Sequence, residues 1–212
     1  MSFTKKSFSI ILSKLKLFEK PNVSLEQYPT EFDVAADFLW NAAMENEIEG
    51  SFVIDLGAGT GILGFGAALL GAKKVTFVDI DKNAIEIAKQ NLNYLKTEFD
   101  LSGCEFDFII SDISKFNTTD KYDLVIQNPP FGVKKEHADK DFLKKAFTLS
   151  SKIYSLHKTE SKTFIEKFSK DEGFKISKSF FYNFPLKSTM HFHTKRIKRI
   201  EVMCFKLEKM KD

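Results

Sequence analysis

The chain has 212 residues, of which 43% are hydrophobic and 29% are charged. This length fits one domain with modest extensions, and the composition excludes a disordered chain. The net charge of only +3 excludes a polycation, so any attraction to nucleic acid must come from local clusters of Lys and Arg. Two cysteines exclude a disulfide framework, and no apolar stretch approaches the length of a membrane-spanning helix. We expect a soluble cytoplasmic protein that contacts no membrane.

The first 45 residues predict a helical extension that packs on the rest of the chain. Apolar residues from Phe8 to Leu15 recur at helical spacing, which predicts an amphipathic helix over residues 4–18. After a polar connector, Thr30 is expected to cap a second helix. Residues 46–212 follow as the core, and no domain-scale linker divides the chain. We therefore expect a single domain over residues 1–212.

From Ser51 onward, apolar runs typical of strands alternate with helical patterns. Continuous apolar strands separated by helices are typical of a parallel sheet that is buried on both faces. The sequence thus predicts an α/β fold with a mostly parallel seven-stranded sheet and helices on both faces. The expected strands are residues 52–56, 75–78, 106–110, 124–126, 153–156, 174–182 and 199–207.

A glycine-rich turn after the first expected strand predicts a cofactor site. The run from Asp55 to Gly61 places three alternating glycines behind an acidic residue, and glycine lets backbone approach a ligand closely. The next strand ends at Asp79, whose carboxylate can accept both hydroxyls of a ribose. Gly59, Gly61 and Gly64 also satisfy a dinucleotide fingerprint. Asp55 nevertheless suits the cationic amino-acid end of S-adenosylmethionine better than a pyrophosphate, and the next motif favours the same cofactor.

The chemistry is predicted by Asn128-Pro129-Pro130-Phe131, which directly follows the fourth expected strand. Carboxyl ends of parallel strands meet at one edge of the sheet, so this turn belongs beside the glycine loop. The Asn128 side chain and the Pro129 carbonyl can both accept hydrogen bonds from one NH2 group, and Phe131 can stack on a base. Two fixed acceptors can align an exocyclic amine with a sulfonium methyl without a strong general base.

With these motifs, the chain resembles class I methyltransferases with a Rossmann-like fold. More narrowly, it resembles the small-subunit ribosomal RNA adenine-N6 methyltransferases of archaea and eukaryotes. The resemblance rests on Leu-Glu-Gln-Tyr-Pro-Thr at 25–30, Asn-Pro-Pro-Phe-Gly at 128–132 and Tyr-Ser-Leu-His at 154–157. It implies methyl transfer from S-adenosylmethionine to the N6 amine of an RNA adenine, with no metal.

The resemblance also implies the residues of the site. It assigns catalysis to Asn128, Pro129, Pro130 and Phe131. Together with Asp55 from the glycine loop, the expected cofactor contacts are Gln27, Thr30, Gly57, Gly59, Thr60, Ile62, Asp79, Asp112 and Ile113. Gln127 stands where an apolar residue is common before the Asn, which affects only details of the pocket.

Two kinds of partner are expected. The resemblance implies a small zinc-containing activator protein that covers an apolar edge strand, here the strand with Phe106 and Phe108. A basic segment near the C-terminus is expected to contact ribosomal RNA, although a solvated charged hairpin explains it almost equally well. Its cations are Lys187, Lys195, Arg196, Lys198 and Arg199.

Two other functions remain open from the sequence. A protein-glutamine N5-methyltransferase that acts on a release factor also uses an Asn-Pro-Pro turn, but it carries Tyr at the position of Phe131 and has an N-terminal substrate-binding domain that this chain lacks. A catalytically silent RNA-binding or assembly module could keep the same fold. The intact Asn128 and Asp79 argue against that alternative.

Overall fold

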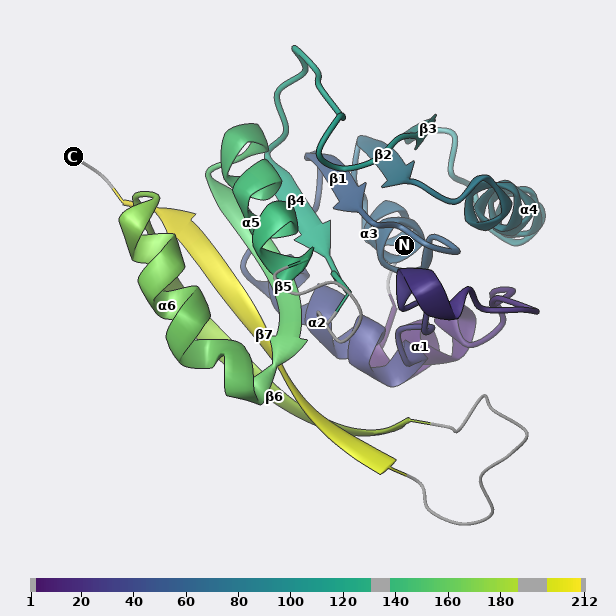
Figure 1. Cartoon of the computed structure of the whole chain (residues 1–212). Helices are drawn as coiled ribbons and strands as arrows, with labels where there is room; N and C mark the ends of the chain where they lie inside the picture. The colour runs from purple at the N-terminus through teal and green to yellow at the C-terminus, as the bar shows by residue number, and fades with distance from the viewer. Residues whose placement is uncertain (1–2, 131–137, 187–197, 211–212) are drawn as a thin grey trace.

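The computed structural model describes residues 3–130, 138–186 and 198–210. Its strands are β1 (Phe52–Leu56), β2 (Lys74–Asp79), β3 (Glu105–Ile110), β4 (Leu124–Gln127), β5 (Lys152–Lys158), β6 (Phe174–Leu186) and β7 (Lys198–Lys209). They form one seven-stranded sheet in the order β3-β2-β1-β4-β5-β7-β6 (Figure 1). Strands β1 to β5 are parallel, and β7 runs antiparallel to both β5 and β6. The predicted mostly parallel seven-stranded Rossmann-like sheet is confirmed.

Helices cover both faces of this sheet. They are α1 (Lys5–Leu12), α2 (Phe32–Met44), α3 (Ile62–Leu69), α4 (Lys82–Glu98), α5 (Ala138–Leu149) and α6 (Lys162–Asp171), with short 3-10 turns at Val23–Leu25 and Thr159–Ser161. The buried residues of α1 to α4 belong to one apolar cluster, whereas α5 and α6 pack in a second cluster on the opposite face. Within the described part of the chain, no helix is both long and apolar enough to cross a bilayer.

Alternation along the strands divides the core between these two layers. Val53 and Phe77 point into the cluster under α3, while Ile54 and Val78 point into the cluster under α5. All four side chains are fully buried. Burial of a side chain of this size stabilises the fold by about 1.5–3 kcal/mol. The central strands are therefore fixed on both faces, which gives the loops at their carboxyl ends a rigid base.

Helix α3 lies unusually close to its neighbours because two of its positions are glycine. A Cβ at Gly64 would lie 2.3 Å from Cε1 of Phe77, and one at Gly66 would lie 2.2 Å from Cδ1 of Leu39. Both distances are far below van der Waals contact. These glycines therefore allow α3 to pack closely against β2 and α2. This packing accounts for Gly64, which the sequence also matched to a dinucleotide-binding fingerprint.

The N-terminal segment departs from two predictions. Helix α1 ends at Leu12 rather than at residue 18, and the chain then turns so that the Asn91 side chain bonds both the backbone N–H (2.8 Å) and the carbonyl (3.0 Å) of Lys16. Thr30 does not cap α2, because the helix follows Glu31 without a side-chain cap. The Thr30 hydroxyl instead accepts a hydrogen bond from Asn128. The hydrogen bond with Asn128 thus takes the place of the helix cap that the sequence predicted for Thr30.

The third strand lies at the sheet edge, as predicted, but its phenylalanines do not point freely outward. The ring of Phe108 stacks on Phe77 with 4.9 Å between centroids, and Phe106 lies 6.3 Å from Phe65. Both side chains are partly buried against the α3 and α4 layer. The most exposed apolar side chain of β3 is Ile110, which is 50% exposed.

The β6–β7 hairpin extends beyond the helical layers and leads to the basic segment (Figure 1). In its ladder the backbones of Lys198 and Arg199 pair with Leu186 and Pro185. Lys187, Lys195 and Arg196 lie outside the described residues.

Candidate active site

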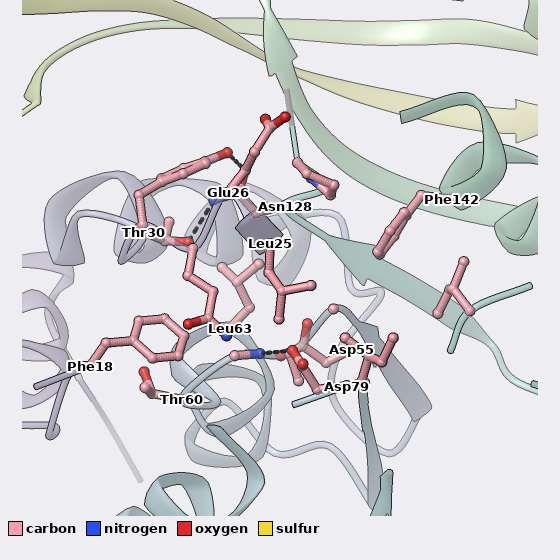
Figure 2. A pocket seen from close by; sticks show the side chains of 18 of the residues that line it. Phe18, Leu25, Glu26, Thr30, Asp55, Thr60, Leu63, Asp79, Asn128 and Phe142 are labelled. Carbon is pink, nitrogen blue, oxygen red and sulfur yellow. Dashed lines mark hydrogen bonds between the residues drawn. The ribbon is translucent and has the colours of Figure 1, made fainter. Parts of the chain in front are cut away.

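A cavity of about 280 Å³ opens at the carboxyl ends of the central parallel strands. Its position agrees with the rule that open α/β sheets bind ligands at this edge, and its size is near the lower end for small-molecule sites. Figure 2 shows the aromatic rings of Phe18 and Phe142 on opposite sides of the hollow, with Asp55 and Asp79 between them. The N-terminal segment, the glycine loop, the strand ends and α5 all contribute to the lining.

The structure brings almost all sequence-predicted site residues to this cavity. Those that line it are Gln27, Thr30, Asp55, Gly57, Gly59, Thr60, Ile62, Asp79, Asp112, Ile113, Asn128 and Pro130. Pro129 lies between two lining residues and presents its carbonyl to the side chain of Tyr28. Phe131 falls outside the described residues, so its predicted stacking role stays a prediction.

The glycine loop is shaped for close approach of a ligand. Gly57 and Gly59 have φ values of +67° and +56°, in the left-handed region where a side chain is strained. The amides of Gly57 and Ala58 donate to the Val78 carbonyl at 2.8 and 3.0 Å, which fixes the loop to the end of β2. A Cβ at Gly57 would lie 2.8 Å from the Phe142 ring. The bare backbone therefore leaves a shallow cradle that side chains would fill.

Asp79 is held in place by the loop that it faces. Its two carboxylate oxygens accept backbone N–H groups from Gly59 (2.7 Å) and Asp81 (2.8 Å). Burial raises the pKa of the Asp79 carboxyl, while these backbone hydrogen bonds oppose the rise. A carboxylate has about four lone-pair sites, so these two contacts do not exhaust its acceptor capacity. A backbone N–H of Ile80 also stabilises the charged form, and the carboxylate keeps acceptor capacity for a ribose hydroxyl beside these backbone contacts.

Asp55 has an unusual protonation behaviour for a carboxyl group. It is 1% exposed, and one of its oxygens accepts the N–H of Gly64 at 2.9 Å. Burial raises the Asp55 pKa to about 7, with the nearby Asp79 charge adding to the rise. A cationic ligand in the cavity would favour the charged carboxylate and lower this pKa. Asp55 is thus suited to lose its proton and pair with the positive end of a bound ligand.

Asn128 is oriented by a hydrogen bond to Thr30, a residue far from it in the sequence. Its Nδ2 donates to the Thr30 hydroxyl at 2.8 Å, which turns the side-chain oxygen the other way. That Oδ1 accepts the hydroxyl of Tyr28 at 3.0 Å, and the Pro129 carbonyl lies 3.3 Å from the same hydroxyl. The two predicted acceptors therefore do converge on one donor atom. Burial, more than any other effect, holds the Tyr28 pKa well above its usual range, so the donor is a neutral phenol.

A buried polar chain supports the strand that leads into this turn. Gln127 donates through Nε2 to the Ser155 hydroxyl at 2.9 Å, and Ser155 lies 2.6 Å from Nε2 of His157. Burial lowers the His157 pKa to about 3, so the imidazole is neutral and its Nε2 accepts the serine proton. The protonated Nδ1 then faces Asp139 of α5 at 3.9 Å. Gln127 is therefore a structural link between β4 and β5, and His157 a structural histidine.

The sequence did not single out three residues at the cavity. Phe18 and Phe142 line it from the segment after α1 and from α5, and Tyr28 lines it from the N-terminal segment. Phe18 and Phe142 carry no motif, because they reach the cavity only through the packing of distant elements. Tyr28 lies within the Glu-Gln-Tyr-Pro-Thr run, which could have identified it.

The lining fits S-adenosylmethionine. The buried Asp55 and the partly buried Asp79 match a cation and a ribose, and the backbone cradle at Gly57 and Gly59 admits close contact. The apolar side chains of Leu25, Ile80 and Ile113 line the same cavity and offer surfaces that suit a purine and a thioether. Among the described residues, no three His, Cys, Asp or Glu side chains group as metal ligands would.

Comparison with known proteins identifies the family. Residues 16–153 match the methyltransferase small domain family. The chain belongs to this family. An uncharacterized protein of Methanocaldococcus jannaschii is 37% identical over 97% of this chain and 94% of its own length. The zebrafish (Danio rerio) rRNA N6-adenosine-methyltransferase METTL5 is 34% identical over 93% of this chain and 95% of its own length.

Solved structures agree with the sequence comparison. A Pyrococcus horikoshii protein, provisionally assigned as an RNA methyltransferase, superimposes with a TM-score of 0.87 at 43% identity and covers 99% of both chains. This methyltransferase therefore groups with RNA-modifying enzymes over its whole length. Membership confirms the predicted enzyme class and its cofactor, S-adenosylmethionine.

Proposed function

We propose that this methyltransferase transfers a methyl group from S-adenosylmethionine to the N6 amine of an adenine in small-subunit ribosomal RNA. The main support for this proposal is that Asn128 Oδ1 and the Pro129 carbonyl both face one donor, the Tyr28 hydroxyl, at 3.0 and 3.3 Å. An NH2 group presents two N–H donors from one nitrogen, and this pair of acceptors matches it. A relative that acts on rRNA adenosine over nearly the same length supports the choice of substrate.

The chain contributes positioning and electrostatics to the reaction. The amine lone pair of adenine is delocalised into the ring, so the nitrogen is a weak nucleophile. Hydrogen bonds to Asn128 and Pro129 direct both N–H groups and turn the lone pair toward the reacting methyl. The sulfonium of S-adenosylmethionine supplies that methyl as an electrophile. The nitrogen becomes acidic only as the new bond forms, so its proton can leave to water without a dedicated base.

The other predicted residues are proposed as cofactor ligands. Asp79 would accept the ribose hydroxyls, Asp112 and Ile113 would hold the adenine, and Asp55 with the loop Gly57 to Thr60 would face the amino-acid end. Ile62 and Gln27 complete this set, with Gln27 already fixed through Nε2 to Asp81 at 2.7 Å. Thr30 is proposed to act mainly by orienting Asn128, since its hydroxyl accepts that amide.

An RNA substrate also needs a surface beside the cavity. The basic segment that follows β6 and runs into the start of β7 is proposed to contact the phosphate backbone, through Lys187, Lys195, Arg196, Lys198 and Arg199. A target adenine would have to leave its helix or lie in a single-stranded loop, because an enzyme cannot reach the amine of a base that is stacked and paired in a duplex. The same fold could serve a release-factor glutamine, but the whole-chain match to an rRNA enzyme favours RNA.

The edge strand β3 is proposed to bind a small zinc-containing activator protein. Ile110 is half exposed, and the outer side of β3 has no strand beside it in the described sheet. An unpaired edge invites addition of a strand from a partner. Purification of the chain alone as a soluble, fully active monomer would remove the support for this partner.

Methyl transfer from labelled cofactor to separated RNA, DNA and release-factor fractions tests the proposal. We expect label in small-subunit ribosomal RNA, recovered as N6-methyladenine after digestion. Label in a release-factor glutamine would assign the alternative enzyme. Cofactor binding by calorimetry without transfer to any fraction would favour a catalytically silent module.

A further inference from the structure

The hydroxyl of Tyr28 occupies the place that the proposed function assigns to the substrate nitrogen. It donates to Asn128 Oδ1 at 3.0 Å and lies 3.3 Å from the Pro129 carbonyl. These are the same two acceptors that must hold the adenine amine. Tyr28 also lines the cavity, so its side chain and a bound base compete for one space.

The segment around Tyr28 is built to bring the hydroxyl to this position. Glu26 has a φ of +51°, which is uncommon for a residue with a side chain and turns the chain sharply before Tyr28. Gln27 anchors the turn to Asp81 at 2.7 Å, and Thr30 anchors its far end to Asn128 at 2.8 Å. The backbone on both sides is thus fixed. The Tyr28 side chain has two rotatable bonds, so a change of rotamer moves the hydroxyl while the anchored backbone stays in place.

A phenol and an amine differ in how many protons they offer. The Tyr28 hydroxyl has one proton and can satisfy only one acceptor at a time. An unmodified adenine amine has two N–H groups and can satisfy both acceptors, which gives it an advantage over the hydroxyl. After one methyl transfer the amine keeps a single N–H group, and that advantage is lost.

We infer that Tyr28 is a specificity-determining residue that competes internally with the substrate amine, an inference that rests on the proposed function. When no base is bound, the Tyr28 hydroxyl occupies the acceptor pair formed by Asn128 and Pro129. An adenine amine with two N–H groups displaces the hydroxyl. When methylation has left the amine a single N–H group, the hydroxyl takes its place at the acceptors again. This return displaces the N6-methyladenine product and prevents a second transfer. In the permitted step one C–S bond breaks, one C–N bond forms, and one amine proton leaves to solvent.

The test compares wild type with Tyr28→Phe, which removes only the hydroxyl. Binding is measured on the complex with S-adenosylhomocysteine, where no transfer occurs, with two synthetic RNA oligonucleotides that span the modified position. One oligonucleotide carries adenine at the target and the other N6-methyladenine. We expect Tyr28→Phe to bind the methylated RNA at least threefold more tightly than wild type, and to accumulate N6,N6-dimethyladenine on long incubation.

Tyr122→Phe is the matched control. Tyr122 is a buried tyrosine just before β4, whereas the acceptor pair follows that strand, and its hydroxyl donates a hydrogen bond to Thr76 at 3.4 Å. It should bind both oligonucleotides as wild type does. If Tyr28→Phe does not fold, Tyr28→Met removes the same hydroxyl and serves instead. Unchanged or weaker binding of methylated RNA by the folded variant overturns the role of Tyr28 alone. Absence of any transfer to RNA by wild type overturns the proposed function, and this inference with it.

Discussion

At the scale of single residues, the role that we propose for Asn128 depends on Thr30 and on its place after β4. The amide can present its oxygen to a substrate only because its nitrogen donates to the Thr30 hydroxyl at 2.8 Å. Loss of one fixed partner of a reacting group costs about 10²–10³-fold in rate. We therefore expect Asn128→Ala to lower methyl transfer at least about 100-fold.

The cofactor should still bind to this variant, because we propose that Asn128 holds the substrate amine and not the cofactor. Calorimetry with S-adenosylmethionine checks that its affinity stays within about threefold of wild type, a change below 1 kcal/mol. The control is Asn93→Ala on the exposed side of α4, which should change neither quantity. Parallel loss of transfer and cofactor affinity in Asn128→Ala would indicate a folding defect instead.

Asp55 predicts a pH dependence of cofactor binding. Its pKa of about 7 means that the buried carboxyl is mostly protonated at pH 6, and a cationic ligand must release that proton to be paired. If Asp55 is fully charged in the complex and half charged in the free protein at pH 7, affinity should be about fivefold weaker at pH 6 than at pH 7. The change is measured by calorimetry.

Asp55→Asn provides the comparison for this prediction, because it cannot ionise and fills nearly the same volume. The variant should bind more weakly at pH 7 and lose most of the difference between the two pH values. The Asp79 carboxyl, whose pKa burial also raises, is present in both proteins, so its own titration contributes to both pH dependences. An equal pH dependence in both proteins would mean that Asp55 does not respond to the cofactor.

At the scale of elements, the link between β4, β5 and α5 depends on a neutral histidine. Burial lowers the His157 pKa to about 3, below the value of about 6.5 for an unfolded chain. The unfolded state therefore binds more protons between these values. This contribution to stability is complete above pH 6.5 and is lost as the pH falls toward 3, by about 1.4 kcal/mol per pH unit.

We expect wild type to lose about 2 kcal/mol more stability than His157→Gln between pH 6.5 and pH 4.5. Urea unfolding at the two pH values measures the difference. Asp55 acts in the opposite direction, since its raised pKa favours the folded state at low pH, but it is common to both proteins. Equal losses in the two proteins would show that His157 accepts a proton without cost to the fold.

At the scale of the whole molecule, the N-terminal helices and the sheet share one core. Phe8 of α1, Leu39 of α2 and Phe65 of α3 belong to the same buried cluster, which supports our proposal that residues 1–45 pack as an extension on the core of 46–212 in one domain. The two parts approach closely at Gly66, where a Cβ would lie 2.2 Å from Leu39. The extension thus fixes the helix that follows the glycine loop.

Overpacking at this contact should destabilise the whole fold. We expect Gly66→Ala to lower the free energy of unfolding by about 1–3 kcal/mol, because α2 and α3 must move apart. Gly103→Ala is the matched control, since nothing lies within 4 Å of its added Cβ. Thermal unfolding compares the two variants. Equal midpoints would mean that Leu39 moves aside easily and that α2 is less tightly coupled to α3 than the distances indicate.

The sequence by itself determined the sheet and the position of the site. Apolar runs such as 52–56 and the alternating glycines after Asp55 act locally, and parallel strands bring their carboxyl ends to one edge whatever the details of packing. Asn128 and Asp79 could therefore be placed at one cavity from their positions after strands. The family resemblance added the contacts of Gln27 and Thr30, which no periodicity indicates.

Only the tertiary structure decided how these groups face one another. Thr30 reads as a helix cap, yet it orients Asn128 from 98 positions away in the chain. Gln127 reads as a departure from an apolar pattern, yet it finds a partner in Ser155 across the sheet. Tyr28 reaches the acceptor pair over a similar separation. Hydrogen bonds between distant residues depend on how whole helices and strands pack together, and local sequence patterns do not predict that packing.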